Sequence, residues 1–68
     1  MTLRQLKAFL VVAQTLNFAE ASKKMFMSQP AMSLAIKSLE ESVGGQLLVR
    51  TTRAVSLTPE GKALYERG

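Results

Sequence analysis

The chain is organised around one stretch, Ser28-Gln29-Pro30-Ala31-Met32-Ser33-Leu34-Ala35-Ile36-Lys37-Ser38-Leu39-Glu40-Glu41. Ser28 is a favourable N-cap, because its hydroxyl accepts a hydrogen bond from an otherwise unpaired N–H in the first helical turn. Pro30 suits that turn, where a missing N–H costs nothing. Apolar residues then recur at steps of three and four, which predicts one buried helical face: Met32, Ala35, Ile36, Leu39 and Val43. Gly44-Gly45 ends the helix.

The opposite face of this predicted helix carries side chains that are mostly short, uncharged or hydrogen-bonding. They are Gln29, Pro30, Ser33, Leu34 and Lys37. A helix with one apolar face and one face of this kind suits insertion into the major groove of DNA.

The composition excludes several classes of protein. With 68 residues, the chain forms one small domain at most. It contains no cysteine, no histidine and no aspartate, and its five glutamates are not clustered with a nucleophile. Disulfides and thiolate metal sites are therefore ruled out, and we expect no catalysis, no metal site and no cofactor.

The charge balance indicates an anionic partner. The formal net charge is +4 and the sequence pI is about 10.0, which is typical of proteins that bind nucleic acid or a membrane surface. Positive charge lies mainly in residues 1–25 and 46–68, on either side of the central stretch. Flanking cations of this kind would hold phosphates while the helix contacts bases, although ordinary solvated surface charge explains the composition equally well.

The apolar run Ala8–Ala13 is too short to be a secretory signal, and nothing in the chain approaches the length of a membrane span. We therefore expect a soluble, cytoplasmic protein with no membrane partner.

Two helices are predicted before the central one. Thr2 and Gln5 form a capping-box pattern that starts a helix over residues 3–15. Its apolar stripe is Leu3, Leu6, Phe9, Leu10 and Ala13, extended by Val12 and Leu16.

A second capping-box pattern, Asn17 with Glu20, starts a short helix over residues 18–25. Only Phe26-Met27 then separates it from the Ser28 cap, which is the spacing of a helix-turn-helix. A plain helical hairpin without DNA-binding function is the alternative.

After Gly45 the pattern changes to two short β-prone runs, 47–50 and 54–57, which predict a hairpin with Arg53 at its tip. A basic hairpin directly after a DNA-contacting helix is a wing, which would lie on the backbone or enter the minor groove. Thr58-Pro59 then starts a further helix toward Gly68. Gly61 is a poor helix former, so something other than helix propensity favours it, and the close approach of another backbone is one explanation.

Several spaced motifs occur together: Leu3-Arg4-Gln5-Leu6 with Phe9, Asn17-Phe18 with Ala21, Ser28-Gln29-Pro30-Ala31-Met32-Ser33, Ile36, Leu39-Glu40, Gly44, Leu47-Leu48 with Arg50-Thr51 and Arg53, and Leu57-Thr58-Pro59-Glu60-Gly61. With them, the whole chain resembles the N-terminal DNA-binding domain of LysR-type transcriptional regulators. The resemblance implies a mostly α fold with a small β-hairpin, a winged helix-turn-helix over residues 1–58. It also implies that residues 59–68 are the truncated start of a linker helix that pairs two subunits.

The same resemblance implies a larger regulator. Its members act as homodimers or homotetramers on operators in promoter DNA and respond to a small-molecule co-inducer. That co-inducer binds a C-terminal domain of periplasmic-binding-protein type, which lies outside these 68 residues.

The resemblance also assigns site residues by position. Gln29, Pro30 and Ser33 match the family's major-groove contacts on a recognition helix over 28–42, and Arg53 matches its minor-groove arginine in a wing over 47–57. Arg50 matches a position that braces the wing, where an ion pair with Glu40 or Glu41 and a phosphate contact are equally expected. The full DNA-facing set is Ser28, Gln29, Pro30, Ser33, Leu34, Lys37, Arg50, Thr51 and Arg53, and the dimer-facing pair is Ala63 and Leu64.

The chain departs from the family at Leu34, where an arginine is common. A leucine there could touch a thymine methyl group, and we hypothesise that it shifts base preference toward A·T at one position of each half-site. The exposed leucine and the uncharged outer face also permit a second function, a winged-helix module that docks a protein partner.

Overall fold

The first helix, α1 (Leu3–Thr15), begins at the predicted capping box. The Gln5 N–H donates to Thr2 Oγ1 and the Thr2 N–H donates to Gln5 Oε1, each over 3.1 Å. The computed structural model describes residues 2–51 and 54–67. Within that part of the chain, no helix is long and apolar enough to cross a membrane.

The second and third helices, α2 (Phe18–Met25) and α3 (Gln29–Val43), form the predicted helix-turn-helix. Asn17 caps α2 through a 3.1 Å bond from the Glu20 N–H, and Ser28 caps α3 through a 3.2 Å bond from the Ala31 N–H. Only half of the second predicted capping box forms, because the Asn17 N–H donates instead to Thr15 Oγ1. The turn between the helices begins at Phe26, whose backbone is left-handed and whose side chain is 96% exposed.

The strands β1 (Leu48–Arg50) and β2 (Val55–Leu57) form the predicted antiparallel hairpin, each one residue shorter than the sequence indicates. Leu48 lies opposite Leu57, and Arg50 lies opposite Val55. The expected tip residue Arg53 lies outside the described residues.

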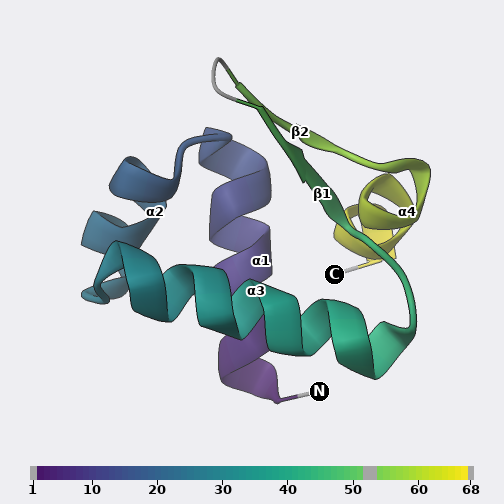
Figure 1. The fold of residues 1–68 in the computed structure, drawn as a ribbon, viewed down its shortest axis with the longest axis horizontal. Coiled ribbons are helices and arrows are strands. Elements are labelled where there is room, and N and C mark those ends of the chain that lie inside the picture. The colour runs from purple at the N-terminus through teal and green to yellow at the C-terminus, as the bar shows by residue number, and fades with distance from the viewer. Residues whose placement is uncertain (1, 52–53, 68) are drawn as a thin grey trace.

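The core lies where α1 crosses behind α3 (Figure 1). The helix α2 packs on both of them, and the hairpin and α4 lie on the side opposite α2. The core combines apolar residues of the three helices, many of them from the predicted stripes, with the start of the hairpin: Ala8, Phe9, Val12, Ala13, Phe18, Ala21, Met32, Ile36, Leu39, Leu47 and Leu48.

Six apolar residues of the predicted stripes are not part of that core. Leu6, Leu10 and Ala35 are partly buried and pack against it, whereas the other three are exposed. Leu3 is 69% exposed, Leu16 is 45% exposed and Val43 is 44% exposed. Each lies in a terminal turn or a cap of its helix, and the first turn of α1 extends past α3 (Figure 1). Burial therefore ends where the neighbouring helix ends, although the apolar periodicity continues.

The last helix, α4 (Pro59–Arg67), is attached to the start of the hairpin by Thr58. The Thr58 hydroxyl donates to the Gln46 carbonyl over 2.6 Å and accepts from the Gly61 N–H over 3.0 Å. The Thr58 N–H donates to the Leu47 carbonyl over 3.0 Å. The predicted backbone approach at Gly61 is confirmed, because a Cβ at this buried residue would clash with the Leu47 carbonyl oxygen.

We expect Gly61→Ala to lower the free energy of unfolding by about 1–3 kcal/mol, since the added methyl group can be accommodated only by moving backbone. Urea denaturation followed by circular dichroism measures this. Gly45→Ala is the matched control, because a Cβ there meets nothing within 4 Å. Equal stability of the two variants would contradict the proposed close contact.

Candidate nucleic-acid interface

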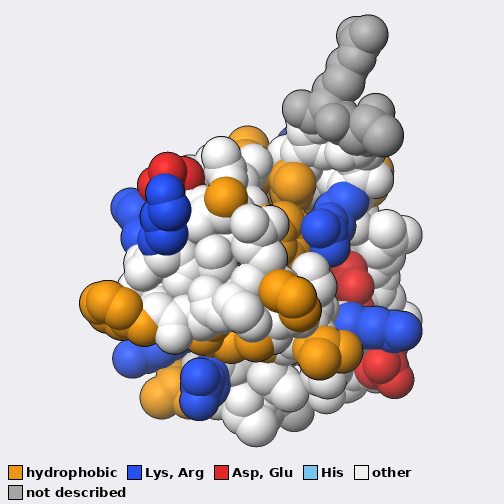
Figure 2. Space-filling model, turned by 60° about the vertical axis from the view of Figure 1, so that its left-hand side comes forward, with side chains coloured by type: hydrophobic (Ala, Val, Ile, Leu, Met, Phe, Trp, Pro, Cys, Tyr) orange, Lys and Arg blue, Asp and Glu red, His pale blue; other side chains and the backbone are white. Residues whose placement is uncertain are grey.

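The outer face of α3 presents the side chains that the sequence predicts. Gln29, Pro30 and Lys37 are exposed, Leu34 is 66% exposed and Ser33 is half-buried. The opposite face is closed into the core, with Met32 and Leu39 fully buried. The face of the molecule in Figure 2 shows Lys and Arg side chains, with acidic ones beside some of them, around a central area of mainly uncharged ones. This is the distribution expected of a surface that contacts bases at its centre and phosphates at its rim.

Ser28 lies at the exposed N-terminal end of this face. Its hydroxyl is occupied by the Ala31 N–H, so the structure gives it the capping role. The first-turn N–H groups and the helix dipole give this end of α3 a partial positive charge.

The hairpin is fixed against α3 by the carboxylate of Glu40. Glu40 Oε2 accepts hydrogen bonds from the N–H groups of Leu47, over 2.7 Å, and Leu48, over 3.2 Å. Two charge-assisted bonds to consecutive backbone groups hold the start of β1 at one position along α3.

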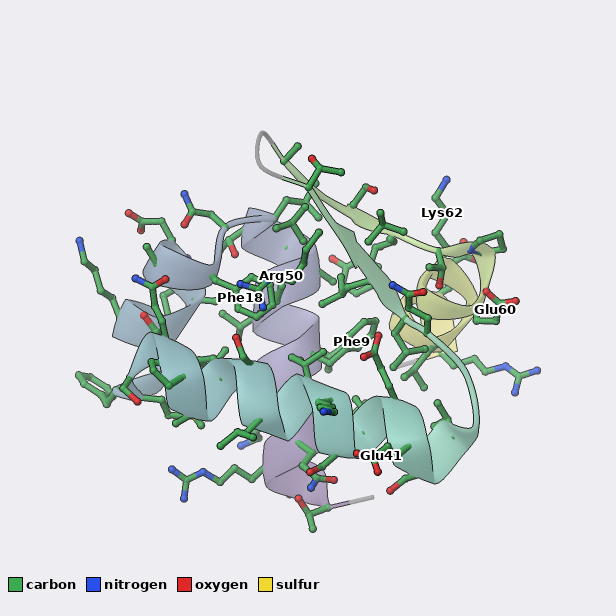
Figure 3. All side chains as sticks on the ribbon, in the orientation of Figure 1. Phe9, Phe18, Glu41, Arg50, Glu60 and Lys62 are labelled. Atoms are coloured by element: carbon green, nitrogen blue, oxygen red, sulfur yellow. The ribbon has the colours of Figure 1, made fainter. Side chains whose placement is uncertain are left out.

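Arg50 does not form the expected ion pair with Glu40 or Glu41. Its guanidinium lies over the ring of Phe18, with Cζ 4.1 Å from the ring centroid. Arg50 Nη1 donates to Ser33 Oγ over 3.0 Å. Figure 3 shows Arg50 beside Phe18, above α3. Arg50 therefore joins β1 to both α2 and α3, which fits the bracing role that the resemblance implies.

Phe18 is the residue that site prediction from the sequence missed. Its side chain is 6% exposed and forms the platform under Arg50. A large aromatic residue at the first position of α2 is the sequence signal, but the pattern alone indicates only a core contact there.

Thr51 is exposed, and it also closes the hairpin through hydrogen bonds to Ala54. Its N–H donates to the Ala54 carbonyl over 2.9 Å, and its hydroxyl oxygen accepts from the Ala54 N–H over 3.1 Å. Arg53, the last residue of the predicted DNA-facing set, is outside the described residues.

The two residues of the predicted dimer-facing pair on α4 differ in burial. Leu64 packs against the core, whereas Ala63 is exposed. Both line a shallow groove between α4 and the C-terminal end of α3, together with Val43, Gly44 and Leu47.

A helix-turn-helix followed by a two-stranded hairpin defines this molecule as a winged helix-turn-helix domain. The family model described as "Bacterial regulatory helix-turn-helix protein, lysR family" matches residues 3–62. The chain therefore belongs to the LysR family of bacterial regulators.

Two transcriptional activators are similar in sequence to nearly the whole of this chain. A probable hydrogen peroxide-inducible genes activator of Streptomyces viridosporus is 52% identical over 97% of this chain and 21% of its own length. HcaR, the hca operon transcriptional activator of Escherichia coli, is 47% identical over 97% of this chain and 22% of its own length. The chain thus spans about a fifth of the length of these regulators.

Solved structures agree with the fold. The DNA-binding domain of CbnR in complex with DNA has a TM-score of 0.94 and 40% identity, covering 98% of this chain and 77% of that one. The DNA-binding domain of BenM in complex with catB site 1 DNA has a TM-score of 0.93 and 42% identity, covering 98% of this chain and 74% of that one.

We expect Glu40→Ala to lower the free energy of unfolding by about 1–3 kcal/mol, because two N–H groups at the start of β1 lose their acceptor. Thermal and urea unfolding measure the loss. Glu41→Ala is the matched control, because Glu41 is the neighbouring carboxylate on α3 and is exposed. The assigned role of Glu40 would be wrong if both variants unfolded at the same urea concentration.

Proposed function

We propose that this chain binds double-stranded DNA sequence-specifically, as the DNA-binding part of a LysR-type transcriptional regulator. The recognition helix, residues 28–42, would lie in the major groove, and the wing, residues 47–57, would lie against the backbone or the minor groove. The observation that carries the proposal is the exposed outer face of α3, which offers Gln29, Ser33 and Leu34 beside the cation of Arg50.

Two kinds of evidence support this function. The similar domains of CbnR and BenM were solved as complexes with DNA. The chain also carries a net charge of +4, and phosphate attraction supplies most of the sequence-independent affinity of such domains.

The chemistry of each DNA-facing side chain indicates whether it would contact a base or the DNA backbone. The Gln29 amide suits bidentate contact with adenine, and Leu34 suits a thymine methyl group. Pro30 would contribute van der Waals contact, and Ser28 and Ser33 hydrogen bonds. Lys37 and the Thr51 hydroxyl suit the backbone, so we assign them to phosphates and Arg53 to the minor groove. Arg50 lies at the same surface, where it donates to Ser33 Oγ.

We further propose the organisation that the family implies. Residues 1–58 would form the DNA-binding domain, and residues 59–68 would begin a linker helix that pairs two subunits through Ala63 and Leu64. The whole protein would act in the cytoplasm as a homodimer or homotetramer controlled by a small-molecule co-inducer. It would act by binding rather than by catalysis.

We expect Gln29→Ala and Lys37→Ala to weaken binding in different ways. Loss of the amide should cost about 1–3 kcal/mol at one base pair only, whereas loss of the ammonium group should weaken all duplexes and reduce the salt slope by about 1. Fluorescence anisotropy on operator and scrambled duplexes at several salt concentrations measures both effects.

Lys62→Ala is the control for charge, because Lys62 lies on α4, away from the outer face of α3 (Figure 3). Absence of salt-dependent binding to any duplex would overturn the proposed function. A protein-docking role for the outer face of α3 would then take its place.

We expect Leu34→Ala to remove a preference for thymine at one base pair of each half-site, because the leucine side chain contacts the 5-methyl group. Binding-site selection compares the preferences of the two proteins. Uracil in place of that thymine should weaken binding of the original chain and leave the variant unaffected. Leu3→Ala is the control, since Leu3 is 69% exposed at the far end of α1. An unchanged selected motif for Leu34→Ala would refute this contact.

A further inference from the structure

The guanidinium of Arg50 is held in one place by two contacts with different chemistry. It lies over the Phe18 ring, with Cζ 4.1 Å from the centroid, and Nη1 donates to Ser33 Oγ over 3.0 Å. Phe18 is 6% exposed, so the ring is a fixed platform. The Arg50–Ser33 bond therefore has a defined position although Arg50 itself is exposed.

That bond leaves the Ser33 hydroxyl with one free hydrogen. A serine hydroxyl has one O–H donor and two acceptor lone pairs, whereas a guanidinium has only donors. Ser33 must therefore be the acceptor toward Arg50. Within residues 2–51 and 54–67, the structure gives the Ser33 hydroxyl no other hydrogen-bond partner. Its O–H is available to the surroundings, and the adjacent positive charge polarises it into a better donor.

We propose that Arg50 acts as a positioning residue that makes Ser33 a hydrogen-bond donor toward DNA. Serine alone pairs with donor and acceptor groups on bases alike. Arg50 occupies one of the two lone pairs of the hydroxyl, and its positive charge disfavours a second N–H donor at the other. Ser33 then favours a base that places an acceptor at the point its O–H reaches (purine N7, guanine O6 or thymine O4) over one that places the amino group of adenine or cytosine there. This inference rests on the proposed DNA binding and specifies its chemistry at one base pair.

A phosphate contact by Arg50 would act differently. It would strengthen binding to every duplex equally and raise the salt dependence of the affinity. Positioning of Ser33 instead changes the ratio of the Kd values for two duplexes that differ at one base pair. That ratio does not depend on the fraction of active protein, so it is measurable even in a destabilised variant.

The experiment is a double-mutant cycle on the 68-residue chain. Fluorescence anisotropy gives Kd for paired duplexes that differ at the base contacted by Ser33, which Ser33→Ala identifies. In one duplex this base presents an acceptor, such as thymine O4 or guanine O6, and in the other an amino group, such as cytosine N4 or adenine N6. For the original chain we expect discrimination on the order of 10-fold, near the lower end of the range for a base contact. Arg50→Gln should abolish it, because a glutamine amide can also accept and restores the ambiguity of the hydroxyl. In the Ser33→Ala background, Arg50→Gln should change the ratio no further.

Three more variants separate positioning from charge and from folding. Arg50→Lys keeps a group that only donates, so it should retain part of the discrimination. Phe18→Leu removes the platform and should reduce the ratio as Arg50→Gln does. Lys62→Gln, which removes one charge from α4, should leave the ratio unchanged.

Base analogues test the direction of the hydrogen bond. Purines lacking N7 or O6, or a thymine analogue lacking O4, should weaken binding of the original chain at that position by the same factor as Ser33→Ala. They should have no effect on Ser33→Ala itself. Discrimination that survives Arg50→Gln, additive effects of Arg50→Gln and Ser33→Ala, or a Ser33-dependent preference for a donor would each overturn the inference. Loss of all salt-dependent duplex binding would instead overturn the proposed function.

Discussion

The carboxylate of Glu40 is the link on which the second half of the molecule depends. A hairpin with three-residue strands is marginal by itself, so it needs attachment to the helices. Glu40 provides this through the N–H groups of Leu47 and Leu48. The Leu47 carbonyl in turn accepts from Thr58, and its backbone covers Gly61. One side chain on α3 thereby fixes the position of the wing and, through Leu47, the start of α4.

The helices could be predicted because their signals are local. Each cap joins a side chain to an N–H three residues away, as in Ser28 with Ala31, so the sequence contains both partners at a fixed spacing. An apolar stripe gives no information about how far the neighbouring helix extends, which is why Leu3 and Val43 were wrongly assigned to buried faces. The left-handed backbone at Phe26 was also unpredictable, because glycine or asparagine usually occupies such a cap.

The candidate site was likewise predictable only where its signals are local. Helical periodicity identifies the outward residues of α3, and Leu34 is indeed exposed. The partners of Arg50 are not local, since Ser33 is 17 residues away and Phe18 belongs to another helix. From the sequence, the nearest carboxylates were reasonable partners for a cation. In the structure Glu40 is engaged with the backbone of β1, and the guanidinium lies over an aromatic face instead.

The energetics indicate that Arg50 serves orientation more than stability. At an exposed site a cation–π contact contributes about 0.5–1 kcal/mol, a small share of the stability of a domain. An arginine is nevertheless better suited to this place than a lysine. Its planar group stacks on Phe18 and still directs an N–H at Ser33, whereas an ammonium group is a point charge without a face. Arg50 is therefore a side chain of the hairpin that reaches back to the outer face of α3. The position of β1, set by Glu40, determines whether that side chain can reach Ser33.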